Sequence, residues 1–268
     1  MKIGIYGDSF ADPIENDSRK FAWFNLLPEY LPNCTTETYG RGATSVYFSY
    51  NEFLRTYKNF DYVIFLVTTP NRYTKQVYNV DGRDRYFHSL NQVESHLKNN
   101  PNSNSRNILE NLIGWFIMND DQYIEDMNEL MIKDILSKKE EILLFPCFEQ
   151  SFSEDRQQQY GLHNDQCMIK IMHQQLKLLG MSLDEYNSYE ENPNTVTCHF
   201  TKDFNYAIAE LFATKIQNGN WNWDIFKKIK LDHTLTYYYN KKNEEEDEAP
   251  LEEIDFFEDD GDCESCKL

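Results

Sequence analysis

A serine, a glycine, an asparagine and a histidine each follow a short run that is predicted to be a β-strand. They are Ser9, Gly42, Asn71 and His199. A serine hydroxyl becomes a good nucleophile when a base takes its proton, and the pKa of histidine suits that task near neutral pH. Acyl transfer also places negative charge on one oxygen, which backbone N–H groups or an asparagine amide can stabilise. The residue types therefore indicate nucleophilic chemistry at Ser9.

Each of these residues has a distinct expected role. His199 would be the base, and the N–H groups of Ser9 and Gly42 with the Asn71 amide would form the oxyanion hole, since glycine lets the backbone approach a substrate oxygen closely. Asp8 is expected to brace the turn through backbone hydrogen bonds. The alternatives are that Gly-Asp-Ser is only a structural turn and that His199 is only a histidine beside a helix N-terminus.

Alternating strands and helices must position these residues. The run at residues 61–69 is apolar on both faces, as in a central parallel strand. Strands are also predicted at residues 2–6, 35–39, 141–148 and 194–200, and helices at 18–31, 44–57, 106–118, 121–138, 165–179 and 201–219. This order predicts a three-layer α/β/α sandwich with a mainly parallel sheet, because right-handed crossovers place helices on both faces. The carboxyl ends of parallel strands share one edge, so the four residues are expected to converge.

Several helix ends can be predicted from single residues. Ser18 and Thr201 are expected N-caps, and Gly180 and Gly219 are expected C-caps. The helices over 106–118 and 121–138 are expected to cover the sheet. Residues 72–105 are polar and have no clear period, which predicts an insertion or lid loop over the strand ends.

The chain of 268 residues is expected to form one domain over residues 1–219. Residues 220–243 would be an extension that either packs back on the domain or lies loose. Residues 244–268 hold 13 acidic residues and one lysine, and this run of like charge predicts a disordered tail. The tail also contains the C-x-x-C of Cys263 and Cys266, which lacks the second pair of ligands that a structural zinc site needs.

The composition disfavours several classes of protein. A net charge of −19 would repel a phosphate backbone, so nucleic acid is not an expected partner. The chain has no apolar stretch of membrane-spanning length and no leader pattern at its start, and its six scattered cysteines do not resemble a secreted disulfide framework. We therefore expect a cytoplasmic protein with reduced thiols. No glycine-rich phosphate loop and no cluster of metal ligands is present in the sequence, so no cofactor or metal is expected.

The blocks around the four residues resemble the SGNH or GDSL hydrolases, a family of esterases, lipases and carbohydrate deacetylases. The resemblance rests on "YGDSF", "YGRGATS", "LVTTPN" and "CHFTKDFNYAIAELF", which occur in this order over residues 1–217. It implies a flavodoxin-like fold, Ser9 as nucleophile, Gly42 and Asn71 in the oxyanion hole, and His199 as base. It also implies a carboxylic ester as substrate, such as a small acyl group on a carbohydrate.

The sequence departs from the family pattern at two places. Thr69-Pro70-Asn71-Arg72 stands where the family usually has Gly-Gly-Asn-Asp, and Val196 stands where it usually has the acid that orients the histidine. A backbone carbonyl could hold His199 in a Ser-His dyad, and the other candidates for a third member or a reserve base are Glu190, Glu191, Asp203 and His163.

A second function stays open, namely a catalytically weak or inactive member of the fold that serves as a binding or assembly module. Its acidic tail, residues 244–268, would contact a partner protein. The composition, rich in Asn and Tyr, is compatible with a viral protein located in the host cytoplasm or the virion. This interpretation rests on analogy at the level of the fold.

Overall fold

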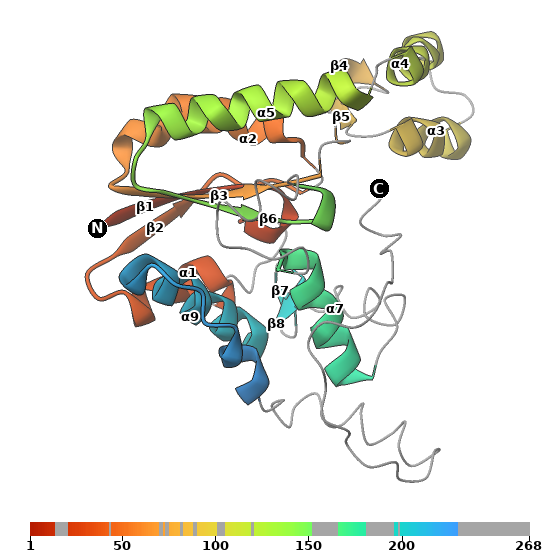
Figure 1. Cartoon of the computed structure of the whole chain (residues 1–268). Helices are drawn as coiled ribbons and strands as arrows, with labels where there is room; N and C mark the ends of the chain where they lie inside the picture. Colours follow the sequence, from red (N-terminus) through yellow and green to blue (C-terminus); the bar gives the residue numbers. More distant parts are fainter. Residues whose placement is uncertain are drawn as a thin grey trace, which may run out of the picture.

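The computed structural model describes residues 1–13, 21–42, 44–69, 72, 75–80, 83–87, 90–100, 105–118, 121–151, 166–180, 196–197 and 199–229. Their centre is a four-stranded, all-parallel sheet with helices on both sides (Figure 1), which confirms the α/β class. The strand order is β2-β1-β3-β6, formed by β2 (Thr35–Thr38), β1 (Lys2–Tyr6), β3 (Tyr62–Val67) and β6 (Ile142–Pro146).

The strand order reverses between β1 and β3. After β1 the chain forms β2 on one side of it, and then crosses back to form β3 on the other side. In an open parallel sheet, ligands bind at the carboxyl ends of the strands where the order reverses in this way. The polar residues at the ends of β1 and β3 therefore lie at the position where a site is expected.

Two pairs of helices cover the sheet. Helices α2 (Val46–Thr56) and α5 (Asp121–Lys138) lie on one side, and α1 (Trp23–Tyr30) and α9 (Lys202–Asn218) lie together on the other (Figure 1). The buried apolar residues of the strands and of these helices form one cluster with those of α7 (Met168–Leu179).

The helix ends test the caps expected from sequence. Gly180 and Gly219 end α7 and α9 in the left-handed conformation, with φ of 63° and 75°, as predicted. Thr201 stands at the predicted N-cap position of α9, but its side chain makes no capping hydrogen bond to the helix. The start predicted for α1 is wrong, because this helix begins at Trp23 and position 18 lies outside the described residues. The backbone N–H of Trp23 donates to Asn205 Oδ1 of α9 at 2.9 Å, so a side chain distant in sequence caps the helix.

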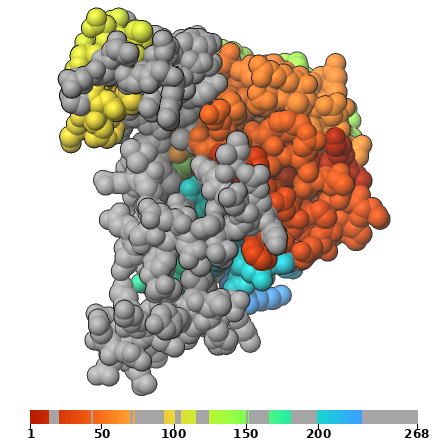
Figure 2. Space-filling view, turned by 180° about the vertical axis from the view of Figure 1, so that it is seen from behind, coloured from red at the N-terminus to blue at the C-terminus, as the bar shows by residue number. Residues whose placement is uncertain are grey.

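The insertion contains regular structure that the sequence pattern did not indicate. Strands β4 (Lys75–Val80) and β5 (Arg83–Phe87) pair antiparallel, and α3 (Leu90–Asn99) follows them. Helix α4 (Arg106–Met118) packs on α3 rather than on the sheet, which corrects the expectation that it covers the sheet. In Figure 2 these two helices, in yellow, lie at one corner of the molecule, away from the red and orange surface of the N-terminal part. The buried side chains of this helix pair are Val93, Leu97, Leu109 and Leu112, and they are not part of the main cluster.

The segment after α9 packs back on the domain. Ile225 and Phe226 are buried, and the rings of Trp221 and Trp223 lie 5.1 and 6.3 Å from the ring of Phe145 in β6. Residues 230–268, with the acidic tail and the C-x-x-C, lie outside the described part of the chain. Of the helices in the described ranges, none is both long enough and apolar enough to cross a membrane.

Candidate functional site

Ser9 begins a short 3-10 turn, Ser9–Ala11, that follows β1 directly. Asp8 caps this turn, because its Oδ1 accepts the Phe10 N–H at 3.3 Å and its backbone carbonyl accepts the Ala11 N–H at 3.0 Å. Asp8, Phe10 and Ala11 are buried, whereas Ser9 is partly exposed. The turn therefore leaves Ser9 partly exposed at the end of β1, where the strand order reverses.

Asp8 also forms a buried ion pair with Arg72, which follows β3. Arg72 Nη1 lies 3.3 Å from Asp8 Oδ2, and the exposed fractions of the two side chains are 8% and 0%. The Cys147 thiol, after β6, donates to Asp8 Oδ1 at 3.4 Å. Burial, and then the Asp8 charge, raise the pKa of this thiol well above its ordinary value, so it remains protonated and able to donate. Asp8 thus joins the ends of three strands.

Aromatic rings connect Arg72 with His199. The Arg72 guanidinium lies 4.8 Å from the centroid of the Phe148 ring. The centroid of Phe148 is 6.0 Å from that of Phe10, which in turn is 5.0 Å from that of the His199 imidazole. The imidazole therefore packs on the residue that directly follows Ser9.

His199 lies in a tight turn between β7 (Val196–Thr197) and β8 (Phe200–Thr201). These two strands form a separate antiparallel sheet, so the prediction that His199 follows a strand of the main sheet is wrong. Gln175 of α7, which is fully buried, fixes the turn on both sides: its Nε2 donates to the His199 carbonyl at 3.1 Å and its Oε1 accepts the Thr201 N–H at 2.7 Å. The histidine has a φ of 68°, which is a strained conformation for a residue with a Cβ.

The Gly42 amide has an acceptor within the protein. Its N–H donates to the carboxylate of Asp12, a residue that is only 4% exposed. The loop before Gly42 lies close to the serine turn, because the Thr38 hydroxyl donates to the Ala11 carbonyl and the Tyr39 N–H donates to the Ile5 carbonyl at 2.7 Å. For the Gly42 N–H to stabilise an oxyanion, the Asp12 carboxylate must give up this hydrogen bond.

The remaining predicted residues are placed only in part. Asp203 lies in the first turn of α9. Among the residues that the structure describes, no group of three or more His, Cys, Asp or Glu side chains could hold a metal ion. Four predicted positions lie outside the described residues, namely Asn71, His163, Glu190 and Glu191.

Two contacts of the candidate site are not predicted from the sequence, those of Arg72 and Asp12. For Arg72 the sequence shows only a departure from the family pattern, although an arginine directly after a buried strand is a signal for a buried ion pair. Asp12 is three residues from Ser9, but nothing in its spacing indicates that it accepts the N–H of a residue after β2.

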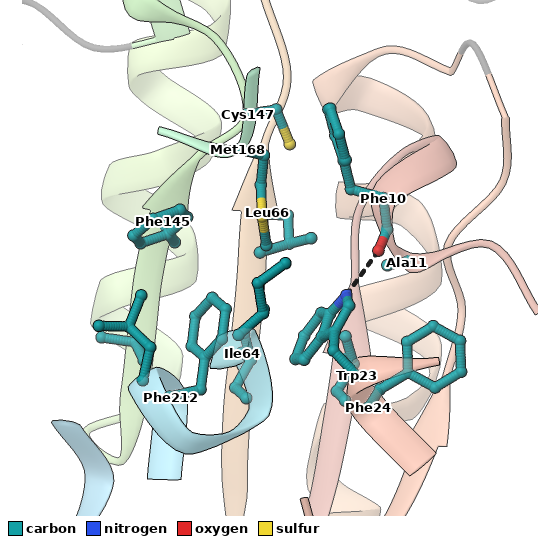
Figure 3. Packing of buried hydrophobic residues seen from close by; sticks show 14 of the residues in the cluster. Phe10, Ala11, Trp23, Phe24, Ile64, Leu66, Phe145, Cys147, Met168 and Phe212 are labelled. Atoms are coloured by element: carbon teal, nitrogen blue, oxygen red, sulfur yellow. Dashed lines mark hydrogen bonds between the residues drawn. The ribbon is translucent and has the colours of Figure 1, made fainter. Parts of the chain in front are cut away.

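Trp23 supports the serine turn from the helix side. Its Nε1 donates to the Phe10 carbonyl at 2.8 Å (Figure 3), and its ring stacks on Phe212 of α9 with centroids 4.8 Å apart. Trp23→Phe keeps much of the apolar contact but removes the donor. We expect the free energy of unfolding to fall by about 1–3 kcal/mol, as for a buried acceptor that loses its partner. Urea denaturation measures this change, and an unchanged midpoint would contradict the importance of this hydrogen bond.

No family model matches this chain, and neither the curated proteins nor the solved structures contain a significant match. What the chain does must therefore be inferred from its own residues and their arrangement.

Proposed function

We propose that this protein is a serine ester hydrolase of the SGNH or GDSL type, with a three-layer α/β/α sandwich as its fold. It would remove a small acyl group, such as acetyl, from a carbohydrate or a similar ester. The observation that supports this proposal best is the packing of the His199 imidazole on Phe10, with ring centroids 5.0 Å apart. Phe10 directly follows Ser9, which is partly exposed at the end of β1. The imidazole thus packs on the residue that follows Ser9, near the carboxyl ends of the strands, where parallel sheets bind their ligands.

The reaction would proceed in two steps. Ser9 Oγ attacks the acyl carbon while His199 takes the hydroxyl proton, and the N–H groups of Ser9 and Gly42 with the Asn71 amide stabilise the oxyanion. The C–O bond to the alcohol then breaks, and His199 returns the proton to the leaving oxygen. A water molecule that gives its proton to His199 next attacks the acyl group on Ser9, which releases the acid and restores the hydroxyl.

The imidazole needs an orienting partner for efficient proton transfer. Val196 stands at the family's usual acid position, so Asp203, Glu190, Glu191 or a backbone carbonyl would take this role. The Gln175 hydrogen bonds and the contact with Phe10 already restrict the position of His199. In serine proteases the loss of the correct orienting acid costs about 10⁴ in rate. We therefore propose a slow enzyme or one adapted to a narrow range of substrates.

The contact between Gly42 and Asp12 favours a second candidate function. A carboxylate on an oxyanion donor opposes the negative charge that acyl transfer creates, as would suit a binding or assembly module without catalysis. In that case the acidic residues 244–268 would contact a partner protein.

Labelling at Ser9 separates the two functions. The full-length protein is incubated with a fluorophosphonate probe and, separately, with p-nitrophenyl acetate. We expect labelling and hydrolysis by the wild-type protein, and neither by Ser9→Ala. Ser137→Ala, in an exposed position on α5, is the matched control and should behave as the wild type. The proposed hydrolase activity would be refuted if the wild-type protein were not labelled, or if the label persisted in Ser9→Ala.

A further inference from the structure

We propose that Arg72 is a positioning residue that sets the Ser9 turn and the His199 ring relative to each other. This inference rests on the proposed function, which assigns the reaction to these two residues. Arg72 acts through two contacts, the ion pair with Asp8 and the stacking on Phe148.

The burial of the ion pair indicates a role other than stability. Removing a carboxylate and a guanidinium from water costs several kcal/mol each, and replacing such a pair with apolar residues is often neutral or stabilising. Here Asp8 is fully buried and Arg72 is 8% exposed. A buried ion pair of this kind adds little to the stability of the fold. We therefore look for its role in the positions that it imposes on the neighbouring residues.

The first contact fixes the backbone of the serine turn. Arg72 holds Asp8 Oδ2, so Oδ1 is directed to the Phe10 N–H and the Cys147 thiol. The Phe10 amide is in the peptide that follows Ser9, so the direction of the carboxylate determines how the turn presents Ser9. Arg72 also neutralises a charge that would otherwise disfavour an oxyanion at this turn.

The second contact fixes the ring on which the imidazole packs. The guanidinium lies over the Phe148 ring, Phe148 contacts Phe10, and Phe10 contacts His199. Phe10 is therefore held at its backbone through Asp8 and at its ring through Phe148, and Arg72 is common to both. A planar guanidinium can make the ion pair and the stacking contact together, whereas the compact ammonium of lysine reproduces mainly the charge.

The test compares Arg72→Met with Arg72→Lys in the full-length protein. In Arg72→Met we expect kcat for p-nitrophenyl acetate to fall by about 100-fold with KM changed less than threefold, as a displacement of about 1 Å in a catalytic geometry can cause. Arg72→Lys should recover about tenfold, since it restores the charge. Arg106→Met, which removes an exposed arginine of α4, is the matched control and should not alter either constant.

A second measurement does not require activity. The imidazole protons of His199 lie beside the Phe10 ring and should show a ring-current shift in NMR spectra, assigned with the variant His199→Asn. We expect these resonances to move in Arg72→Met and to move less in Arg72→Lys. If Arg72→Met does not fold, the double variant Asp8→Asn/Arg72→Met, which leaves no unpaired charge, takes its place.

Unchanged kcat together with unchanged His199 resonances in a folded Arg72 variant would overturn the positioning role. The role would also be overturned if the activity fell only in proportion to the fraction of folded protein while the His199 resonances of the folded form stayed unchanged. If the wild-type protein itself neither hydrolyses ester nor takes the label, the proposed function fails, and the resonances alone decide whether Arg72 positions the histidine.

Discussion

His199→Gly is expected to abolish ester hydrolysis and to leave the folded protein close to the wild type in stability. The substitution removes the base, and loss of the base in a serine hydrolase lowers kcat by about 10⁶. His199 has a φ of 68°, which costs a residue with a Cβ about 1–2 kcal/mol and costs glycine almost nothing. The greater entropy that glycine gives the unfolded chain offsets about 0.5–1 kcal/mol of this gain. The lost contact with the Phe10 ring offsets a further ~0.5–1.5 kcal/mol.

The variant His199→Asn separates the two effects. Asparagine tolerates the left-handed conformation but cannot act as a base, so this variant should be inactive and close to wild type in stability. His173→Asn on α7 is the control histidine and should retain activity. Initial rates with p-nitrophenyl acetate and urea denaturation measure the two quantities. Activity of His199→Gly within tenfold of wild type would exclude His199 as the base, and a large loss of stability would exclude strain at this position.

Gly40→Ala is expected to lower the free energy of unfolding by about 3 kcal/mol, the upper part of the usual range for overpacking. A Cβ at position 40 would lie well inside van der Waals distance of the carbonyl group and the Cβ of Ala11. Most of this obstacle is backbone rather than a flexible side chain, so the loop after β2 and the serine turn would have to separate. The hydrogen bond between the Gly42 N–H and Asp12 would be displaced with them.

Gly114→Ala provides the matched control for this prediction. Gly114 lies in α4, and a Cβ there would meet no atom within 4 Å. The control should therefore raise the free energy of unfolding by about 0.5–1 kcal/mol, as alanine does in a helix interior. Urea midpoints with unchanged m-values measure both changes. Equal midpoints for Gly40→Ala and the wild type would show that the two loops are not held as closely as described.

Strongly periodic segments were predictable from sequence. The bounds of β1, α4 and α5 agree with the predicted ranges, and Gly180 and Gly219 end their helices where expected. These signals are local, since apolar spacing and a left-handed cap depend on nearby residues. The start of α1 was not predictable in this way, because Asn205 of α9 caps it.

The site was predictable in its residues rather than in its contacts. Short predicted strands followed by polar residues indicated Ser9 and His199, and the structure brings the His199 ring to the residue after Ser9. The pairing of Asp8 with Arg72 depends on which strands are neighbours, and no short sequence motif contains that information. The small sheet around His199 likewise depends on Gln175, a side chain from another helix.

The segment from β4 to α4, residues 75–118, has a consequence for how such a protein can diverge. It leaves the parallel sheet just after Arg72, returns through α5, and buries the side chains of α3 and α4 apart from the main cluster. Substitutions, deletions or replacements in this unit therefore need not disturb the packing around Ser9 and His199. A lineage could exchange the whole unit, and with it the surroundings of the strand ends, while it inherits the serine turn and the histidine turn unchanged.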